Sequence, residues 1–328
     1  MSGSASASVS VIVPTKNRPL DLVSVCQSIS RQTVPPRQVI IVDQGRDTEA
    51  REAVANFYRR APQGHAVTLK LDYIWDTTLT GLTAARNRAM EIACGDIWLF
   101  LDDDVILEPD FVQELLAVYA RHPQVAGVSG VVTNYRPNRW HSRLWDSAFV
   151  LGPFRDDRRP VYWQSAQLRN SEPVQVTRLG GGLMSFRAEA LRGRRFDESL
   201  VGVSDGEDVD FCFGLGPQAV LMIAPKARLV HNSSPIGRSR DYGWRRDVKT
   251  SHFLYTKYLR RGIKNRIFFG WLNFGYALLA TFGSLRRWSL APWRSLLGGM
   301  EEGRSAGAKM QNEKANARPN PAFSEERH

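Results

Sequence analysis

The first hundred residues alternate between short apolar runs and amphipathic stretches of helical length. Each apolar run ends in turn residues, and the segments between them carry apolar residues at helical spacing. The predicted strands are Ser8–Pro14, Arg37–Asp43, Leu69–Trp75 and Asp96–Leu101, and the predicted helices are Leu20–Arg31, Thr48–Arg60 and Thr80–Cys94. Strands that alternate with helices predict an α/β fold with a doubly wound, mostly parallel sheet flanked by helices.

The pattern changes along the rest of the chain. Asn134–Thr177 shows no clear periodicity, and strand-like segments return between Arg178 and Asn232. From Asp241 onward the sequence is helical in pattern and basic. We therefore expect three parts: a catalytic α/β domain at 1–235, a basic, aromatic helical extension at 236–302, and a disordered, polar tail at 303–328.

Composition narrows the cellular context. The chain has 328 residues, of which 43% are hydrophobic, enough for a large core. Its three cysteines are far apart, so we expect small buried apolar residues in a reducing cytosol rather than a disulfide framework or a zinc site: Cys26, Cys94 and Cys212. The first residues carry neither a basic segment nor a long apolar run, so we expect no signal peptide and a cytoplasmic location.

The net charge of +11 is concentrated near the C-terminal part. Between Arg228 and Arg266 there are eleven Lys or Arg residues and two acids. The following segment, Ile267–Gly283, contains no charged residue and is flanked by arginines and tryptophans. Two interpretations remain open: a helix in the headgroup region of an anionic membrane, at the inner face of the cell membrane, or a helix packed on the protein or in a dimer interface. The sequence does not determine the oligomeric state.

Three polar clusters follow the ends of predicted strands. They are the turn Pro14–Arg18, the carboxylate of Asp43, and the run Asp102–Asp104. In open α/β sheets ligands bind outside the carboxyl ends of the strands, so we expect these clusters to meet at one edge.

The acidic run has the composition of a cation site. Side chains at i and i+2 of an extended segment point the same way, so Asp102 and Asp104 can address one ligand. Hard divalent cations prefer carboxylate oxygens, and an added imidazole such as His231 favours Mn²⁺ over Ca²⁺. The alternatives are a solvated acidic turn and a surface histidine.

A second acidic group, "DGEDVD" at Asp205–Asp210, marks a helix start, where acids also favour the helix dipole. Just upstream, the glycines Gly180–Gly182 remove side chains and allow close approach of a ligand, although a β-bulge would need the same residues.

Taken in order, these motifs resemble a known family. "VIVPTKNR", "VDQG", "GLTAARNRA", "FLDDD", "GGGLMSFR", the "ED" pair and a later His are similar to glycosyltransferase family 2, which is inverting and has the GT-A fold. The resemblance spans Ser8–His231, and it is greatest to bacterial members that use rhamnosyl or galactofuranosyl donors. One departure is "VDFCFGLG" after the "ED" pair, where family members often carry a basic residue.

The resemblance implies transfer of a sugar from a nucleotide-diphosphate donor to a saccharide or lipid-linked saccharide, in cell-surface polysaccharide or glycolipid synthesis. It implies Asp208 as general base, with Glu207 orienting the acceptor or capping the helix. It implies Mn²⁺ or Mg²⁺ on Asp104 and His231, with Asp102 on the metal or the ribose. The donor-binding residues implied are Pro14, Thr15, Asn17, Arg18, Asp43, Arg86, Asp102, Asp103, Gly181 and Gly182.

Other functions explain the residues less well. A nucleotidyltransferase of related fold would have a glycine-rich first turn, and "PTKNR" has no glycine. A phosphoacceptor receiver domain would carry paired acids after the first strand, where this chain has Thr15 and Lys16. A nucleic-acid-binding protein would use the basic segment but would leave the acidic run without a role, so we expect no nucleic-acid partner.

Overall fold

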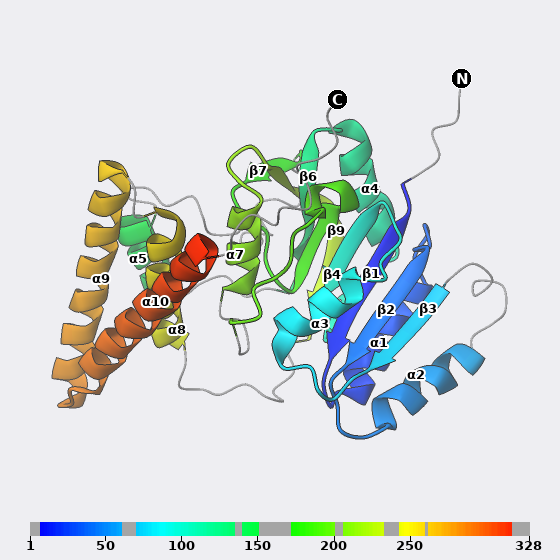
Figure 1. Cartoon of the computed structure of the whole chain (residues 1–328), viewed down its shortest axis with the longest axis horizontal. Helices are drawn as coiled ribbons and strands as arrows, with labels where there is room; N and C mark the ends of the chain where they lie inside the picture. Colours follow the sequence, from blue (N-terminus) through cyan, green and yellow to red (C-terminus); the bar gives the residue numbers. More distant parts are fainter. Residues whose placement is uncertain are drawn as a thin grey trace. The chain divides into compact units, whose positions relative to one another are not determined.

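The computed structural model describes residues 7–60, 70–134, 140–150, 172–200, 206–232, 243–259 and 262–316. The chain divides into two compact units (Figure 1). Unit 1 comprises Met1–Asn138 and Asp157–Arg238, and unit 2 comprises Arg139–Asp156 and Ser239–His328. The predicted boundary at 235/236 lies outside the described residues.

Unit 1 is built on one mixed sheet in the strand order β3-β2-β1-β4-β8-β6-β9-β5, with β7 paired to β9. Its strands are β1 (Val9–Thr15), β2 (Gln38–Asp43), β3 (Lys70–Trp75), β4 (Ile97–Leu101), β5 (Val105–Leu107), β6 (Val125–Val132), β7 (Val174–Val176), β8 (Leu183–Arg187) and β9 (Val220–His231). The helices of this unit are α1 (Pro19–Ser30), α2 (Glu49–Arg60), α3 (Gly81–Met90), α4 (Phe111–Arg121) and α7 (Glu207–Gly214), with a 3₁₀ turn, η3, at Ala188–Leu191. The predicted α/β fold is confirmed.

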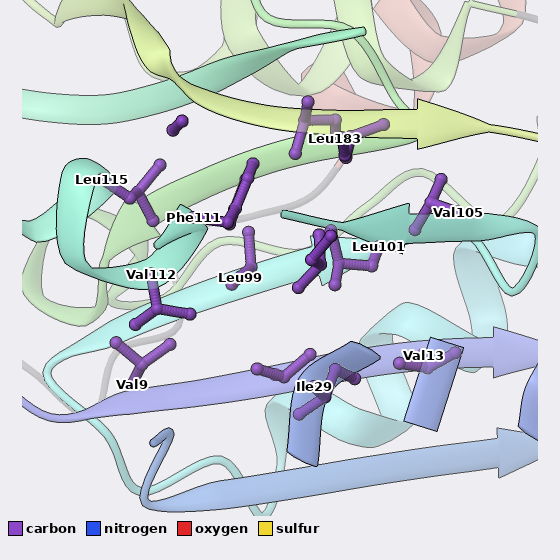
Figure 2. Close-up of a cluster of buried hydrophobic side chains, with 14 of the residues drawn as sticks. Val9, Val13, Ile29, Leu99, Leu101, Val105, Phe111, Val112, Leu115 and Leu183 are labelled. Carbon is purple, nitrogen blue, oxygen red and sulfur yellow. The ribbon is translucent and has the colours of Figure 1, made fainter. Parts of the chain in front are cut away.

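The half of the sheet built from β1 to β4 is parallel, as the alternation of strands and helices predicts. Every residue of β1 and β2 is buried, because helices cover both faces of the sheet. Successive side chains enter different cores: Val11 and Val13 join the one that contains α1 and α4, and Ile12 joins the one that contains α3 and α7. Figure 2 shows the first of these cores, in which Phe111 of α4 lies among strand residues.

Beyond β4 the strand directions mix, and this brings distant segments together. β8 runs antiparallel to β4, with Leu183 opposite Leu101, so the glycines before β8 lie beside the end of β4. β5 runs antiparallel to β9, with Val105 opposite His231. The residue before Val105 is Asp104, so this register places His231 beside the acidic run.

The cysteines do not share one environment. Cys26 and Cys212 are buried, as predicted, but Cys94 is exposed, so the prediction is wrong for that residue. Cys94 lies in the turn between α3 and β4, where its Sγ is 3.3 Å from Oε1 of Gln38.

Unit 2 is helical. It contains α5 (Trp140–Trp145), a π-helical turn η1 (Asp146–Val150), α8 (Gly243–Leu254), a second π-helical turn η4 (Tyr255–Leu259), α9 (Ile263–Arg287) and α10 (Ala291–Asn316). The α5 segment groups with these helices rather than with the α/β domain expected at 1–235, because its aromatic side chains pack on α9. The ring of Trp145 lies 5.4 Å from that of Tyr276, and the indole of Trp271 donates to the carbonyl of Ala148 at 2.8 Å.

The expectation of a disordered tail from Gly303 is wrong for residues 303–316, which form the second half of α10. Three glycines at intervals of four residues, Gly299, Gly303 and Gly307, lie on the face of α10 that packs against α8 and the π-helical turn after it. A Cβ at Gly299 would lie 2.9 Å from the carbonyl oxygen of Arg245. Gly303 and Gly307, inside the segment expected to be disordered, therefore permit a close approach of two helices. Residues 317–328 lie outside the described residues.

Gly303→Ala should destabilise unit 2, because a Cβ there would collide with the carbonyl oxygen of Lys249 and lie 2.7 Å from the Cβ of His252. We expect a loss of about 1–3 kcal/mol in the free energy of unfolding, measured by thermal denaturation. Gly270→Ala on α9 is the matched control, since its Cβ would meet no atom within 4 Å and the change should be neutral or slightly stabilising. Equal melting temperatures for the two variants would contradict the close approach.

Candidate active site

Three predicted metal ligands meet at the carboxyl edge of the sheet. One ligand atom from each of Asp102, Asp104 and His231 lies within 4.8 Å of the other two. The His231 Nε2 atom is 2.9 Å from Oδ1 of Asp104, whose side chain is almost fully buried. Asn134, at the end of β6, fixes the end of β9 through two hydrogen bonds of 3.0 Å with the main chain of His231. Two carboxylates and one imidazole in this arrangement fit a divalent ion such as Mn²⁺.

The middle acid of the run, Asp103, has other partners, although Arg18 also lies 3.7 Å from Asp104. Asp103 accepts hydrogen bonds from the Thr15 hydroxyl at 2.7 Å and from the Arg18 guanidinium at 2.9 Å. Burial raises the pKa of Asp103 to about 6, although both partners act to lower it. This buried carboxylate therefore ties the turn after β1 to the end of β4.

Arg86 of α3 is the largest fully buried side chain among the described residues. Its guanidinium donates to the carbonyl of Gly181 at 2.6 Å and to Glu207 at 3.4 Å, and it lies 3.7 Å from Asp102. The ring of Phe196 lies beside it, 5.3 Å from the guanidinium carbon. Arg86 thus joins the acidic run to the "ED" pair through its contacts with Asp102 and Glu207.

The glycines before β8 lie between the two acidic groups. A Cβ at Gly182 would lie 2.6 Å from Oδ2 of Asp102, and one at Gly181 would lie 3.0 Å from Oε1 of Glu207. Glycine at both positions therefore leaves room for the Asp102 and Glu207 carboxylates where they lie, and a larger residue would have to displace them.

The two acids at the start of α7 differ in exposure. Glu207 is buried against Arg86, and burial followed by the charge of Asp208 raises the pKa of Glu207 to about 7. Asp208 is half-buried, and its Oδ2 accepts a hydrogen bond from the main-chain N–H of Gly181 at 2.9 Å. Asp208 is thus the member of the pair with access to a ligand.

The predicted nucleoside residues are held by a network among the first three strands. Asp43 is fully buried and accepts hydrogen bonds from the Tyr73 hydroxyl and the Gly45 N–H, both at 2.7 Å. Pro14 is also buried, whereas Asn17 is exposed and has a positive φ of 56°. Trp75, an exposed residue at the end of β3, donates its indole N–H to the carbonyl of Gly45 at 2.8 Å.

A family model for glycosyl transferase family 2 matches residues 10–193, more than half of the chain. The chain belongs to glycosyl transferase family 2. The matched part of this family 2 chain contains the acidic run and the glycines, and it ends before Glu207, Asp208 and His231. Those three residues join the site through the geometry described above.

Named relatives of this family 2 chain are distant. It is 29% identical over 230 residues to a validoxylamine A glucosyltransferase of Streptomyces hygroscopicus subsp. limoneus, covering 65% of this chain and 49% of that protein. It is 29% identical over 239 residues to the succinoglycan biosynthesis protein ExoM of Rhizobium meliloti, covering 70% of this chain and 68% of that protein. The chain thus spans about half the length of the first relative and about two thirds of the second.

Solved structures support the GT-A fold. The mannosyltransferase PcManGT of Pyrobaculum calidifontis, determined with GDP-Man and Mn²⁺, has a TM-score of 0.58 and 19% identity to this chain. The match covers 93% of this chain and 88% of that structure.

Three residues that hold this family 2 site were not singled out from the sequence: Asn134, Tyr73 and Asn87. Asn87 follows Arg86, is buried, and donates to the carbonyl of Phe196 at 2.9 Å, which fixes the ring beside the guanidinium. The motif "AARNRA" was the available signal, because two successive polar residues on a helix face otherwise rich in alanine are unusual for a solvated surface. Arg88, the other arginine of that motif, is partly exposed and pairs with Glu91 at 2.7 Å.

Arg86→Met should destabilise unit 1 by about 3–5 kcal/mol, because it leaves buried carboxylates without their cation. Glu207→Gln alone should destabilise less, since burial already favours the uncharged form of this carboxyl, and the double variant should lose less than the sum of the two. Urea denaturation of the four proteins measures this coupling. Additive losses would show that the two side chains do not stabilise each other.

The same proteins test the pKa of Glu207. A buried carboxyl whose pKa is raised from 4.5 to about 7 binds a proton more readily in the folded state. Its contribution to stability is therefore present below pH 4.5 and is lost as the pH rises through about 7. Glu207→Gln should flatten the dependence of stability on pH in this window.

Proposed function

We propose that this chain is a divalent-metal-dependent, inverting glycosyltransferase that moves a sugar from a nucleotide-diphosphate donor to an acceptor hydroxyl. The observation that carries the proposal is the meeting of two groups at one sheet edge: a cation site of two carboxylates and an imidazole, and a half-exposed carboxylate, Asp208, across Gly181 and Gly182. Membership of family 2 supports it. It does not support the nucleotidyltransferase alternative.

The charge of the site argues for a bound cation. Five acids and two arginines line it, so the protein alone leaves an excess of negative charge where a diphosphate must bind: Asp102, Asp103, Asp104, Glu207 and Asp208, with Arg18 and Arg86. Asp102, Asp104 and His231 would hold Mn²⁺, as the donor set favours, or Mg²⁺. A divalent ion bound there would stabilise the negative charge that develops on the departing diphosphate.

The donor nucleoside would bind along the turn after β1 and the end of β2. Asn17 and Arg18 present polar groups at this rim, whereas Pro14, Thr15 and Asp43 are buried and would act by shaping it. The base and the sugar stay open, and a rhamnosyl or galactofuranosyl donor remains a prediction.

In the proposed reaction the acceptor oxygen attacks the anomeric carbon opposite the leaving group. The new C–O bond forms as the bond to the diphosphate breaks, and the electron pair leaves with the nucleoside diphosphate. Asp208 takes the proton of the acceptor hydroxyl, and the Gly181 N–H orients its carboxylate. A single displacement inverts the anomeric configuration, which NMR of the initial product would establish.

The acceptor would be a saccharide or a lipid-linked saccharide. The name of ExoM connects that relative with succinoglycan synthesis, which supports a role in cell-surface polysaccharide or glycolipid synthesis. Such a reaction would take place in the cytoplasm, and with a lipid-linked acceptor it would take place at the inner face of the cell membrane.

Nucleoside-diphosphate binding should require a divalent ion. We expect calorimetry to detect UDP or GDP binding in Mn²⁺ and at least tenfold weaker binding in EDTA. Asp104→Asn should remove this dependence, because it deletes one ligand charge at the site, whereas Glu52→Gln, an exposed acid on α2, should behave as wild type. Equal affinities in Mn²⁺ and EDTA would contradict the metal site.

Asp208→Asn should lower turnover by about 10²-fold or more while leaving donor affinity nearly unchanged, because the amide keeps an oxygen for the Gly181 N–H but cannot take a proton. Steady-state kinetics and donor calorimetry separate the two effects. Glu207→Gln is the matched control, and it should reduce stability more than chemistry. Normal turnover in Asp208→Asn together with loss of turnover in Glu207→Gln would reverse the assignment.

A further inference from the structure

Helix α9 has two apolar faces with different surroundings. One face, which includes Phe268, Leu272 and Tyr276, is buried against Leu296 of α10 and Val248 of α8 within unit 2. The other face carries large exposed hydrophobic side chains: Ile263, Ile267, Phe274, Leu278, Leu279, Phe282 and Leu285. The sequence left open whether this segment packs or faces a membrane, and among the described residues one face of the helix packs while the other is exposed.

The exposed side chains form a stripe along the helix. Ile263, Ile267, Phe274, Leu278 and Phe282 recur at intervals of four or seven residues, so they lie on one side of α9. Phe282 is 68% exposed, and Trp288, just beyond the helix end, is 96% exposed. A row of exposed isoleucine, leucine and phenylalanine side chains of this length marks an interaction surface.

The positive charge around the exposed face of α9 favours a negatively charged partner. Residues 262–300 contain five basic residues and no acid: Lys264 and Arg266 near the start of α9, Arg286 and Arg287 at its end, and Arg294 on α10. All five are exposed. Two copies of this face would oppose like charges, whereas an anionic lipid surface offers opposite charge and an apolar interior.

The packing of α9 within unit 2 also favours one orientation of the helix relative to a membrane. The helix is long and apolar enough to cross a membrane by length and composition, with a mean hydropathy of 1.2, and 28% of the span is buried within the protein. However, its inner face is occupied by α8, α10 and the aromatic residues of the α5 segment. A helix that crossed the membrane would lose these contacts. A helix lying flat on the membrane would keep them, because only its exposed stripe would contact lipid.

We infer that the α9 face docks flat on a bilayer containing anionic phospholipid, with the stripe inserted at the headgroup boundary and the arginines at the helix ends on lipid phosphates. The exposed indole of Trp288 suits the interface between headgroups and acyl chains. This docking is independent of the proposed sugar transfer, and it would bring the enzyme to lipid-linked acceptors.

Co-sedimentation of the full chain with vesicles tests the inference. We expect binding to vesicles of phosphatidylcholine with 30% phosphatidylglycerol at low salt, and at least tenfold weaker binding to phosphatidylcholine alone. The variant Phe282→Ser/Leu285→Ser should lose at least tenfold in binding with an unchanged melting temperature, since these side chains are 68% and 69% exposed. Leu20→Ser is the matched control, because this leucine of α1 is 81% exposed in unit 1.

Charge and orientation have their own controls. Arg286→Glu/Arg287→Glu should abolish binding to anionic vesicles, whereas Arg51→Glu/Arg59→Glu on α2 should not. A wash at pH 11 should release the wild-type protein from vesicles, and retention would overturn the flat orientation. Absence of binding to anionic vesicles, or a lipid-free dimer abolished by Phe282→Ser/Leu285→Ser, would overturn the membrane partner. Mn²⁺-dependent nucleotide binding, measured in parallel, reports separately on the proposed activity.

Discussion

The rest of the site depends on the contacts that the buried guanidinium of Arg86 makes. A charge removed from water is tolerated only when partners satisfy it, and this one contacts the Gly181 carbonyl, Glu207 and Asp102. Those partners come from three separate segments, so a single side chain fixes the distance between the acidic run, the glycine turn and α7. The glycines at 181 and 182 leave room for these carboxylates, because a Cβ at either position would press on one of them.

The change of strand direction beyond β4 then builds the two halves of the site. The parallel strands present the β1 turn and the acidic run at their carboxyl ends, where ligands bind in such sheets. The antiparallel pairs β4–β8 and β5–β9 add the glycines and His231 to the same edge. The proposed cation site and the proposed base, Asp208, therefore lie on either side of Gly181 and Gly182.

In unit 2, small residues on α10 allow close helix packing, whereas large residues on α9 form an exposed apolar face. Glycines at intervals of four on α10 allow backbone to approach backbone, and this accounts for the packing of α8 and α10. On α9 the large residues divide into a buried face and an exposed one. Residues 262–300, which include this face, contain five basic residues and no acid, so its composition matches an anionic surface better than a copy of itself.

Local pattern alone predicted the strands β1 to β4, because strands covered on both faces must be apolar throughout, and it predicted the edge at which their polar ends meet. It also singled out Asp102, Asp104 and His231, since few residue types serve a hard cation. Only the tertiary structure decided that Arg86 and Asp43 are buried, that Cys94 is exposed, and that the glycine-rich tail continues α10 through Asn316. Burial depends on which distant segment covers a residue. Glu207, for example, contacts Arg86 from 121 positions away, and local periodicity carries no information about that partner.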